Sequence, residues 1–382
     1  MRLSVISAAT VAALVGYAAS VAVVLAAAAA LGATAAQTAS WLLAVSLGKA
    51  VGSAFLSWQS RVPVVLAWST PGAALIAATS GISMAEAVAA FVTVGVMIVL
   101  TGALRPLGAL VARIPDGIAA GMLAGVLLPF CLKGAGAAEA LPWLVLPMVA
   151  VFVLVRLFNP ALAVLAAFVG GIALAFATGT ALPEVDFAAP SLTLIVPELR
   201  WSVILGLGVP LYLVTMASQN LPGFAVLRAA GYEPPVGLAL RVTGVISAVT
   251  AVFGAHTVSM AAITAAICLG PEVHPDRERR WIVGVVYACV WVMLGLLSPV
   301  IITLLAALPP EVVTALVALA LLGPLMGALN GAGASQDQRF AAIVTLVVTG
   351  SGVAALGIGA AFWGLVAGLV VHGVERLARR RA

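Results

Sequence analysis

Apolar stretches of about 20 residues, the length of a membrane-crossing helix, follow one another along almost the whole chain. Clear examples run over 5–31, 88–104, 282–305 and 340–358. We therefore predict an all-α polytopic membrane protein. The pattern divides the chain into fourteen transmembrane segments: 4–30, 41–60, 63–82, 85–104, 115–132, 140–158, 161–180, 201–220, 237–253, 255–270, 281–305, 311–328, 340–358 and 361–378.

Two predicted segments, the third and the tenth, carry small polar residues where the others are apolar. The third contains Ser69-Thr70-Pro71-Gly72, and the tenth contains His256-Thr257 shortly after Gly254. In secondary transporters such discontinuous helices occur in pairs, and their free N-termini point at the substrate near the bilayer midplane. The pair favours a transporter in which the two breaks lie within a few ångströms of each other.

An internal repeat relates the two halves of the chain. Adding 187 to the residue number carries Ser69-Thr70 onto His256-Thr257, and adding 194 carries Ile114–Gly117 onto Leu308–Glu311. Because seven segments per half is an odd number, the second half must be inverted relative to the first. We predict 7+7 inverted repeats with discontinuous segments 3 and 10. Coincidental matching of helix breakers in an Ala/Val/Leu-rich chain stays open as the alternative.

Charge and composition agree with a membrane protein. Of the 382 residues, 64% are hydrophobic and 8% are charged, and the mean hydropathy is +1.23. Lys and Arg concentrate in cytoplasmic loops, so we expect both termini in the cytoplasm and explain the net charge of +5 by topology rather than by nucleic-acid binding. This orientation places on the cytoplasmic side Arg2, Arg61, Arg105, Arg113, Arg156, Arg228, Arg241, Arg277, Arg279, Arg280, Arg339, Arg376 and Arg379–Arg381, and leaves Lys133 and Arg200 outside.

Two further features narrow the class of protein. The first apolar stretch is too long for the hydrophobic region of a cleaved signal peptide, so we expect a retained first span. The three cysteines, Cys131, Cys268 and Cys289, lie in apolar runs without CxxC spacing. We expect neither a disulfide nor a metal site, and no cofactor.

Three strings of residues resemble the benzoate:proton symporter family of bacteria: Trp68–Ala74, Val214–Gly223 and Ala261–Cys268. Gly16-Tyr17 with Ser20, and Gly270–Asp276, fit the same family. The resemblance implies the fourteen-segment fold of the uracil and sulfate transporters. In that fold a core domain, here 1–112 and 201–307, moves against a gate domain, here 113–200 and 308–382.

By this resemblance the chain imports benzoate or a related aromatic carboxylate with protons, by alternating access, across the bacterial inner membrane. Related folds often form homodimers through the gate domain, and nothing in this sequence decides whether this chain does. One departure concerns coupling. Uracil transporters carry acidic residues in segments eight and ten, whereas this chain has Ser218-Gln219-Asn220 and His256 there. The coupling scheme of the uracil carriers therefore does not transfer.

The residues at the two breaks suit an anionic substrate. Helix N-termini offer unpaired N–H groups and partial positive charge to a carboxylate, and hydroxyl and amide side chains add donors. We expect no acid, lysine or arginine in this core, and we expect Trp68 and Met260 to face an aromatic ring or simply to pack. The substrate-binding candidates are Tyr17, Ser20, Ser69, Thr70, Pro71, Gly72, Ser218, Gln219, Asn220, His256 and Thr257.

His256 is the candidate for proton coupling, because it is the histidine at the expected site and intramembrane ionisable residues are usually functional. With an unperturbed pKa of about 6.5, it can take up a proton as a carboxylate enters. The alternative is a neutral histidine that only makes hydrogen bonds. Asp116 and Glu311, at the starts of segments five and twelve, are either gate residues or residues that stabilise the first helical turn.

Other function classes remain as alternatives. A membrane enzyme needs clustered His, Asp or Glu, and a channel needs a continuous polar lining. Neither pattern is present in the predicted segments. Among carriers, one for another small anion or a nucleobase on the same fold stays open.

Overall fold

The computed structural model describes residues 2–104, 115–184, 189–261 and 263–379. Four arginines of the predicted cytoplasmic set, Arg105, Arg113, Arg380 and Arg381, lie outside the described residues, as does the predicted domain boundary at 112/113.

Eight helical stretches of the described chain are long and apolar enough to cross a membrane. Three of them are interrupted: α1 and α2 form one stretch, α10 to α12 alternate with the π-helical turns η1 and η2 in another, and the short η3 precedes α15 in a third. Their bounds are α1 Leu3–Ala18, α2 Val21–Ala30, α3 Ala35–Ser60, α5 Met84–Ala103, α7 Asp116–Ala140, α10 Trp201–Val203, η1 Ile204–Gly208, α11 Val209–Thr215, η2 Met216–Asn220, α12 Leu221–Ala229, η3 Arg277–Arg279, α15 Ile282–Leu296, α17 Pro310–Ala334 and α19 Ala360–Arg379.

The remaining elements are shorter. Four apolar helices have 10 to 17 residues: α8 Pro142–Phe158, α9 Ala163–Ala177, α13 Val236–Ala251 and α18 Arg339–Gly350. Three short helices, α4 Thr70–Ala77, α14 Ile263–Ile267 and α16 Ser298–Ala306, and two strands, β1 Leu66–Trp68 and β2 Val258–Met260, complete the described chain.

Some predicted segment ends were wrong, for local reasons. The segment predicted over 281–305 breaks at Leu297, because α16 begins at Ser298 with a proline in its first turn. The segment predicted over 340–358 ends as a helix at Gly350. Gly352 and Gly357 then adopt left-handed backbone angles, with φ 71° at both.

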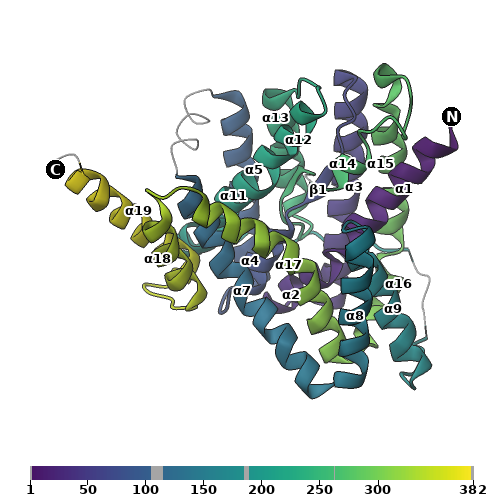
Figure 1. Cartoon of the computed structure of the whole chain (residues 1–382), viewed down its shortest axis with the longest axis horizontal. Helices are drawn as coiled ribbons and strands as arrows, with labels where there is room; N and C mark the ends of the chain where they lie inside the picture. The colour runs from purple at the N-terminus through teal and green to yellow at the C-terminus, as the bar shows by residue number, and fades with distance from the viewer. Residues whose placement is uncertain (1, 105–114, 185–188, 262, 380–382) are drawn as a thin grey trace.

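The two strands lie side by side, with β1 among the helices near the middle of the molecule (Figure 1). They pair antiparallel, with Ala67 opposite Ser259. The chain reaches β1 after Arg61 ends α3 in a left-handed conformation (φ 57°) and Pro63 prevents further helix. It reaches β2 after Gly254, also left-handed at φ 90°, which follows the end of α13. Each strand is followed by a short helix, α4 or α14.

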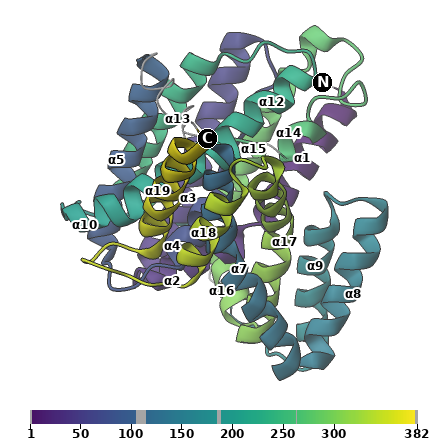
Figure 2. The same ribbon diagram turned by 60° about the vertical axis from the view of Figure 1, so that its left-hand side comes forward.

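The long helices pack in two groups. Helix α5 packs against α13, and α3 packs against α15 and α13. Helix α7 packs against α17 and α18, α18 against α19, and α8 against α9 (Figure 2). Glycines allow the closest approach: a Cβ added to Gly95 of α5 would lie 2.5 Å from the backbone nitrogen of Ala248 in α13.

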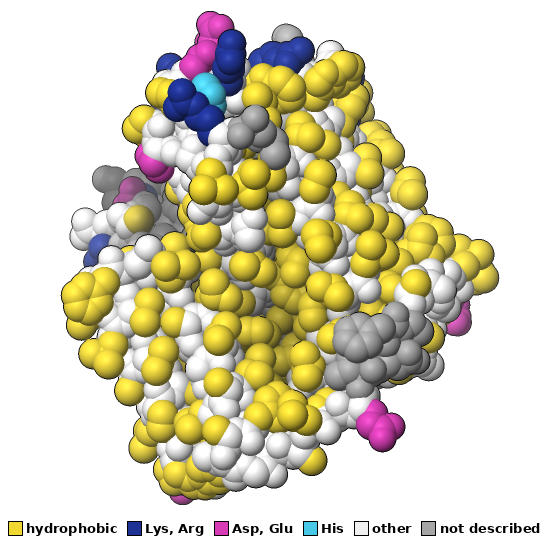
Figure 3. All heavy atoms as spheres, turned by 90° about the vertical axis from the view of Figure 1, so that its right-hand side faces the viewer, with side chains coloured by type: hydrophobic (Ala, Val, Ile, Leu, Met, Phe, Trp, Pro, Cys, Tyr) yellow, Lys and Arg dark blue, Asp and Glu magenta, His cyan; other side chains and the backbone are white. Residues whose placement is uncertain are grey.

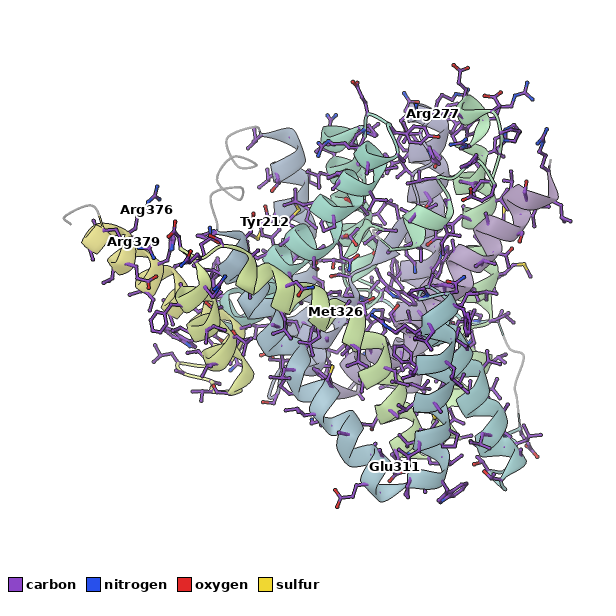
Figure 4. The ribbon with its side chains drawn as sticks, viewed as in Figure 1. Tyr212, Arg277, Glu311, Met326, Arg376 and Arg379 are labelled. Atoms are coloured by element: carbon purple, nitrogen blue, oxygen red, sulfur yellow. The ribbon has the colours of Figure 1, made fainter. Side chains whose placement is uncertain are left out.

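The surface is dominated by apolar side chains. Figure 3 shows them covering most of one face, with charged side chains gathered mainly at its upper end. Leu157, Phe158 and Val169 of α8 and α9 are 73%, 87% and 56% exposed, which suits contact with lipid rather than water. Arg277 and Glu311 lie at opposite ends of the molecule (Figure 4).

Candidate functional site

The N-terminus of α4 lies beside the residues that precede β2. Ser69 is the N-cap of α4, and its hydroxyl oxygen accepts a hydrogen bond from the Gly72 N–H at 3.1 Å. Pro71 fits the first turn because it needs no backbone donor. The Ser69 N–H donates to the carbonyl oxygen of Thr257 at 3.1 Å. The two polar breaks found in the sequence are therefore in direct contact.

His256, in the second break, is fully buried and contacts the first break through Ser69. Its Nδ1 accepts a hydrogen bond from Nε1 of Trp41 at 2.9 Å, and its Nε2 lies 3.2 Å from the carbonyl oxygen of Ser69. An indole N–H only donates, so Nδ1 must be the acceptor and Nε2 carries the hydrogen that bonds to Ser69. A neutral imidazole satisfies both contacts.

Two side chains of the eighth predicted segment form hydrogen bonds to β2 and to the residue just before it. Asn220, at the end of the π-helical turn η2, accepts a hydrogen bond from the Met260 N–H at 2.9 Å. The hydroxyls of Thr215 and Thr257 are 3.0 Å apart. A Cβ on Gly223 would come within 2.5 Å of the Cβ of Met260, so this contact is tight. The side-chain oxygen of Asn220, Oδ1, is thus engaged by the protein itself.

Three other predicted donors, Ser218, Gln219 and Thr70, differ in whether they are hydrogen-bonded to other residues of the protein. The Ser218 hydroxyl donates within its own helix to the Val214 carbonyl at 2.6 Å. The Gln219 amide is half-buried and makes no hydrogen bond to another described residue. Thr70, the first residue of α4, is also half-buried. The side chains of Gln219 and Thr70 are therefore donors that no hydrogen bond to another described residue occupies.

An aromatic cluster, Tyr17, Trp68 and Trp291, adjoins the start of α4. The ring centroids lie 5.5 Å apart for Tyr17 and Trp68, 5.7 Å for Tyr17 and Trp291, and 5.3 Å for Trp68 and Trp291. The Trp68 indole donates to the Ser20 hydroxyl, which in turn donates to the Gly16 carbonyl. Two of the predicted residues, Tyr17 and Ser20, are brought together here, whereas the predicted ring neighbour Met260 packs against Gly223.

Lys49 of α3 contradicts the expectation that no lysine or arginine lies in the core. It is fully buried, and its Nζ lies 3.5 Å from the ring centroid of Trp68 and 2.9 Å from that of Trp291. Among the described Lys, Arg, Asp and Glu residues it is the one buried side chain. The sequence carries a signal for it, because a lone lysine inside the apolar segment 41–60 is an intramembrane charge.

Asp116 and Glu311 both lie in the first turn of a helix, α7 and α17 respectively. Neither forms a salt bridge with another described residue. The N-terminus of α7 is capped instead by Gln338, whose side-chain oxygen accepts from the Gly117 N–H at 2.9 Å. The positions of Asp116 and Glu311 in these first turns favour interaction of their carboxylates with the helix dipoles.

The site is closed in this conformation, since Lys49, Ser69, His256 and Thr257 are all 0% exposed. Two surface hollows lie elsewhere. One, of about 300 Å³, is an apolar groove between α3 and α13 that includes Gly48 and Ile246. The other, of about 520 Å³, surrounds the loop from Arg228 to Pro234. Neither is lined by the polar residues of the two breaks.

Comparisons with known proteins agree on one family. A family model described as benzoate membrane transport protein matches residues 1–374. The inner membrane protein YdcO of Escherichia coli (strain K12) is 40% identical over 368 residues, which cover 96% of this chain and 94% of the relative. The benzoate membrane transport protein of Acinetobacter baylyi is 35% identical over 335 residues, covering 87% and 85% of the two chains.

Solved structures show the same fold at low sequence identity. The transmembrane domain of the cyanobacterial bicarbonate transporter BicA matches with a TM-score of 0.64 at 15% identity, over 97% of this chain and 98% of that chain. SLC26A9 matches with a TM-score of 0.65 at 15% identity, over 98% of this chain and 66% of that chain. At this identity the similarity extends to the fold alone.

Proposed function

Because the chain belongs to the benzoate membrane transport protein family, we propose that it is a secondary active transporter that imports benzoate or a related aromatic carboxylate with protons by alternating access. The chain is a multi-pass membrane transporter and not an enzyme, since its family is one of membrane transport proteins. The substrate class and the coupling to protons are the parts proposed here.

The packing of the helices supports fourteen segments arranged as inverted repeats. In such a repeat, segment 2 (α3) corresponds to segment 9 (α13), and segment 4 (α5) to segment 11 (α15). The contact of α3 with α15 is then equivalent to that of α13 with α5, and both are extensive. The antiparallel pairing of β1 with β2 fits a two-fold relation between discontinuous segments 3 and 10. We propose the core and gate domains on the same basis.

We propose that the end of the molecule carrying Arg277 faces the cytoplasm, together with both termini, in a bacterial inner membrane. Positive charge concentrates on the cytoplasmic side of such proteins. Arg277, Arg279 and Arg280 occur within four residues of one loop, at the end opposite Glu311. A homodimer is an additional proposal that follows from the fold class.

One observation carries the proposed substrate class: the N-terminus of α4 adjoins a buried aromatic cluster. The strand residue Trp68 belongs to the cluster and is followed directly by Ser69, the N-cap of α4. A helix N-terminus favours a carboxylate, and aromatic side chains favour an aromatic ring. A benzoate-like molecule has these two parts joined directly.

The proposed function is tested by uptake of radiolabelled benzoate into proteoliposomes that contain the purified protein. An inward proton gradient should drive benzoate above its external concentration, and a proton ionophore should abolish this accumulation. Protein-free liposomes measure the passive entry of benzoic acid. Uptake equal to that of protein-free liposomes at every gradient would refute the proposal.

The alternative is a carrier for another small anion or a nucleobase, because a helix N-terminus binds any small electron-rich group. Competition separates these cases. Excess unlabelled benzoate or a ring-substituted benzoate should block uptake, whereas bicarbonate, sulfate and uracil should not. The reverse order of competition would favour the alternative.

A further inference from the structure

We propose that Lys49 is the counter-ion of the substrate carboxylate and carries the cotransported proton. This inference rests on the proposed function, because it assigns the charge chemistry of the same site. It names a residue outside the set that the sequence pattern indicated, and it assigns Tyr17, Trp68 and Trp291 as the receptor for the substrate ring.

The first observation is that three buried polar groups of one cluster have no hydrogen-bond partner among the described residues: Tyr17 Oη, Lys49 Nζ and Trp291 Nε1. Buried polar groups are nearly always paired, so an unpaired group needs a specific explanation. These three groups lie around the indole rings of Trp68 and Trp291, so a single bound ligand would explain why all three are unpaired. All three can donate a hydrogen bond, and a carboxylate accepts several.

The second observation is the absence of a counter-ion for Lys49. The helices and strands that pack against α3 are α13, α15, α16, β1 and β2. Their titratable or charged side chains are Arg241, Tyr287 and Cys289, and His256 and Tyr17 approach from neighbouring segments. No Asp or Glu is among these described groups, and none of the described acids is buried.

The contacts and chemistry of these neighbours single out Lys49. Tyr17 also lacks a hydrogen-bond partner among the described residues, but a phenol is neutral near neutral pH and acts there as a hydrogen-bonding group. His256 uses both ring nitrogens, and the Tyr287 hydroxyl donates to the Leu66 carbonyl at 2.9 Å. Arg241 and Cys289 are exposed. An ammonium at Lys49 would have indole faces beside it, and these stabilise a cation far less than a carboxylate does.

Charge balance then links substrate and proton. An isolated charge in a low-dielectric interior is costly, whereas a paired ammonium and carboxylate form a neutral unit. In the proposed cycle the empty site holds a neutral amine. One carboxylate and one proton enter together, the proton binds Nζ, and the resulting ion pair crosses as a neutral load. After the carboxylate leaves, the ammonium loses its proton to the cytoplasmic side.

Three substitutions test this proposal in purified protein, each checked for a monodisperse state. Lys49→Met removes the charge, Lys49→Arg fixes it, and Lys133→Met is the matched control at the chain's other lysine, which is exposed. Binding of radiolabelled benzoate and proton uptake in weakly buffered solution are measured together. The wild-type protein and Lys133→Met should take up one proton for each benzoate bound.

The two variants at Lys49 should separate binding from coupling. Lys49→Met should bind benzoate on the order of a hundredfold more weakly, as for loss of one partner of a buried charge pair. Lys49→Arg should keep binding and benzoate exchange but lose proton uptake and gradient-driven accumulation. If Lys49→Met does not fold, Lys49→Arg and the wild-type stoichiometry still decide the question.

Several results would overturn the inference. These are wild-type binding of benzoate without proton uptake, wild-type affinity in Lys49→Met, or wild-type proton uptake in Lys49→Arg. In each of these cases benzoate binding persists, so the proposed substrate class survives, and gradient-driven uptake into proteoliposomes tests the coupling to protons separately. If the wild-type protein binds no aromatic carboxylate at all, the proposed function fails and the inference fails with it.

Discussion

The Ser69 N–H donates to the carbonyl oxygen of Thr257, and this single hydrogen bond joins two segments that lie 188 residues apart in the chain. It extends the antiparallel pairing of β1 and β2 by one step. The side chain of His256 reinforces it by donating to the Ser69 carbonyl. The start of α4 is therefore positioned by residues of the second half of the chain. A substitution in either half should alter the position of the α4 N-terminus.

Asn220→Ala should destabilise the fold as well as alter the site. The substitution leaves the Met260 N–H of β2 without its acceptor, and a buried unsatisfied donor costs about 1 to 3 kcal/mol. Thermal unfolding in detergent should show a clearly lower midpoint. Gln219→Ala, at the neighbouring residue whose amide makes no hydrogen bond to another described residue, is the matched control. Equal midpoints for Asn220→Ala and wild type would show that this bond contributes nothing.

Gln219→Ala should behave in the opposite way. Its amide makes no hydrogen bond to another described residue, so the free energy of unfolding of the variant should stay within about 0.5 kcal/mol of that of the wild-type protein. Benzoate binding should weaken by about 1 to 3 kcal/mol if the amide donates to the carboxylate. Equilibrium binding of radiolabelled benzoate checks this. Unchanged affinity would show that Gln219 does not bind the carboxylate. If Asn220→Ala also left the affinity unchanged, the eighth segment would be structural rather than substrate-binding.

His256→Gln should retain gradient-driven accumulation of benzoate. A glutamine can accept from Trp41 and donate to Ser69, which reproduces both contacts of the neutral imidazole but cannot titrate near neutral pH. Uptake and counterflow are measured in the same vesicles. Counterflow without accumulation would show instead that His256 carries the proton. His256→Leu, which leaves both partners unpaired, controls for the structural role.

Much of this arrangement could be predicted from the sequence. The apolar stretches of about 20 residues predicted membrane-spanning helices, and the small polar residues at Ser69-Thr70 and His256-Thr257 predicted the two breaks. What could not be predicted depends on long-range contacts. The Trp41 and His256 side chains meet across 215 residues, and the acceptor role of Asn220 depends on where β2 lies. No local pattern encodes such pairings.

Lys49 is a different case, because its signal was present in the sequence. The two polar breaks indicated a site in segments 3 and 10. Lys49 lies outside them, in the unbroken helix α3 between Gly48 and Ala50. An ionisable residue inside an apolar segment is expensive and usually functional wherever it occurs. Its aromatic partners Trp68 and Trp291 come from two other elements, and only the fold brings them together.

The proposed orientation predicts the accessibility of engineered cysteines. In a variant lacking Cys131, Cys268 and Cys289, Glu278→Cys should react with a membrane-impermeant maleimide only in inverted vesicles. Glu311→Cys should react in intact spheroplasts, because Glu311 lies at the opposite end of the molecule from the loop that contains Glu278. Labelling of both positions from the same side would contradict the proposed topology.

The most direct measurement is a crystal structure of the protein with 4-bromobenzoate, in which the anomalous signal of bromine locates the ring. We predict the bromine within the cluster of Tyr17, Trp68 and Trp291, with the carboxylate within hydrogen-bonding distance of Lys49 Nζ and directed toward the N-terminus of α4. Bromine bound instead in the apolar groove between α3 and α13, with the site beside the paired strands β1 and β2 empty, would contradict this location of the substrate.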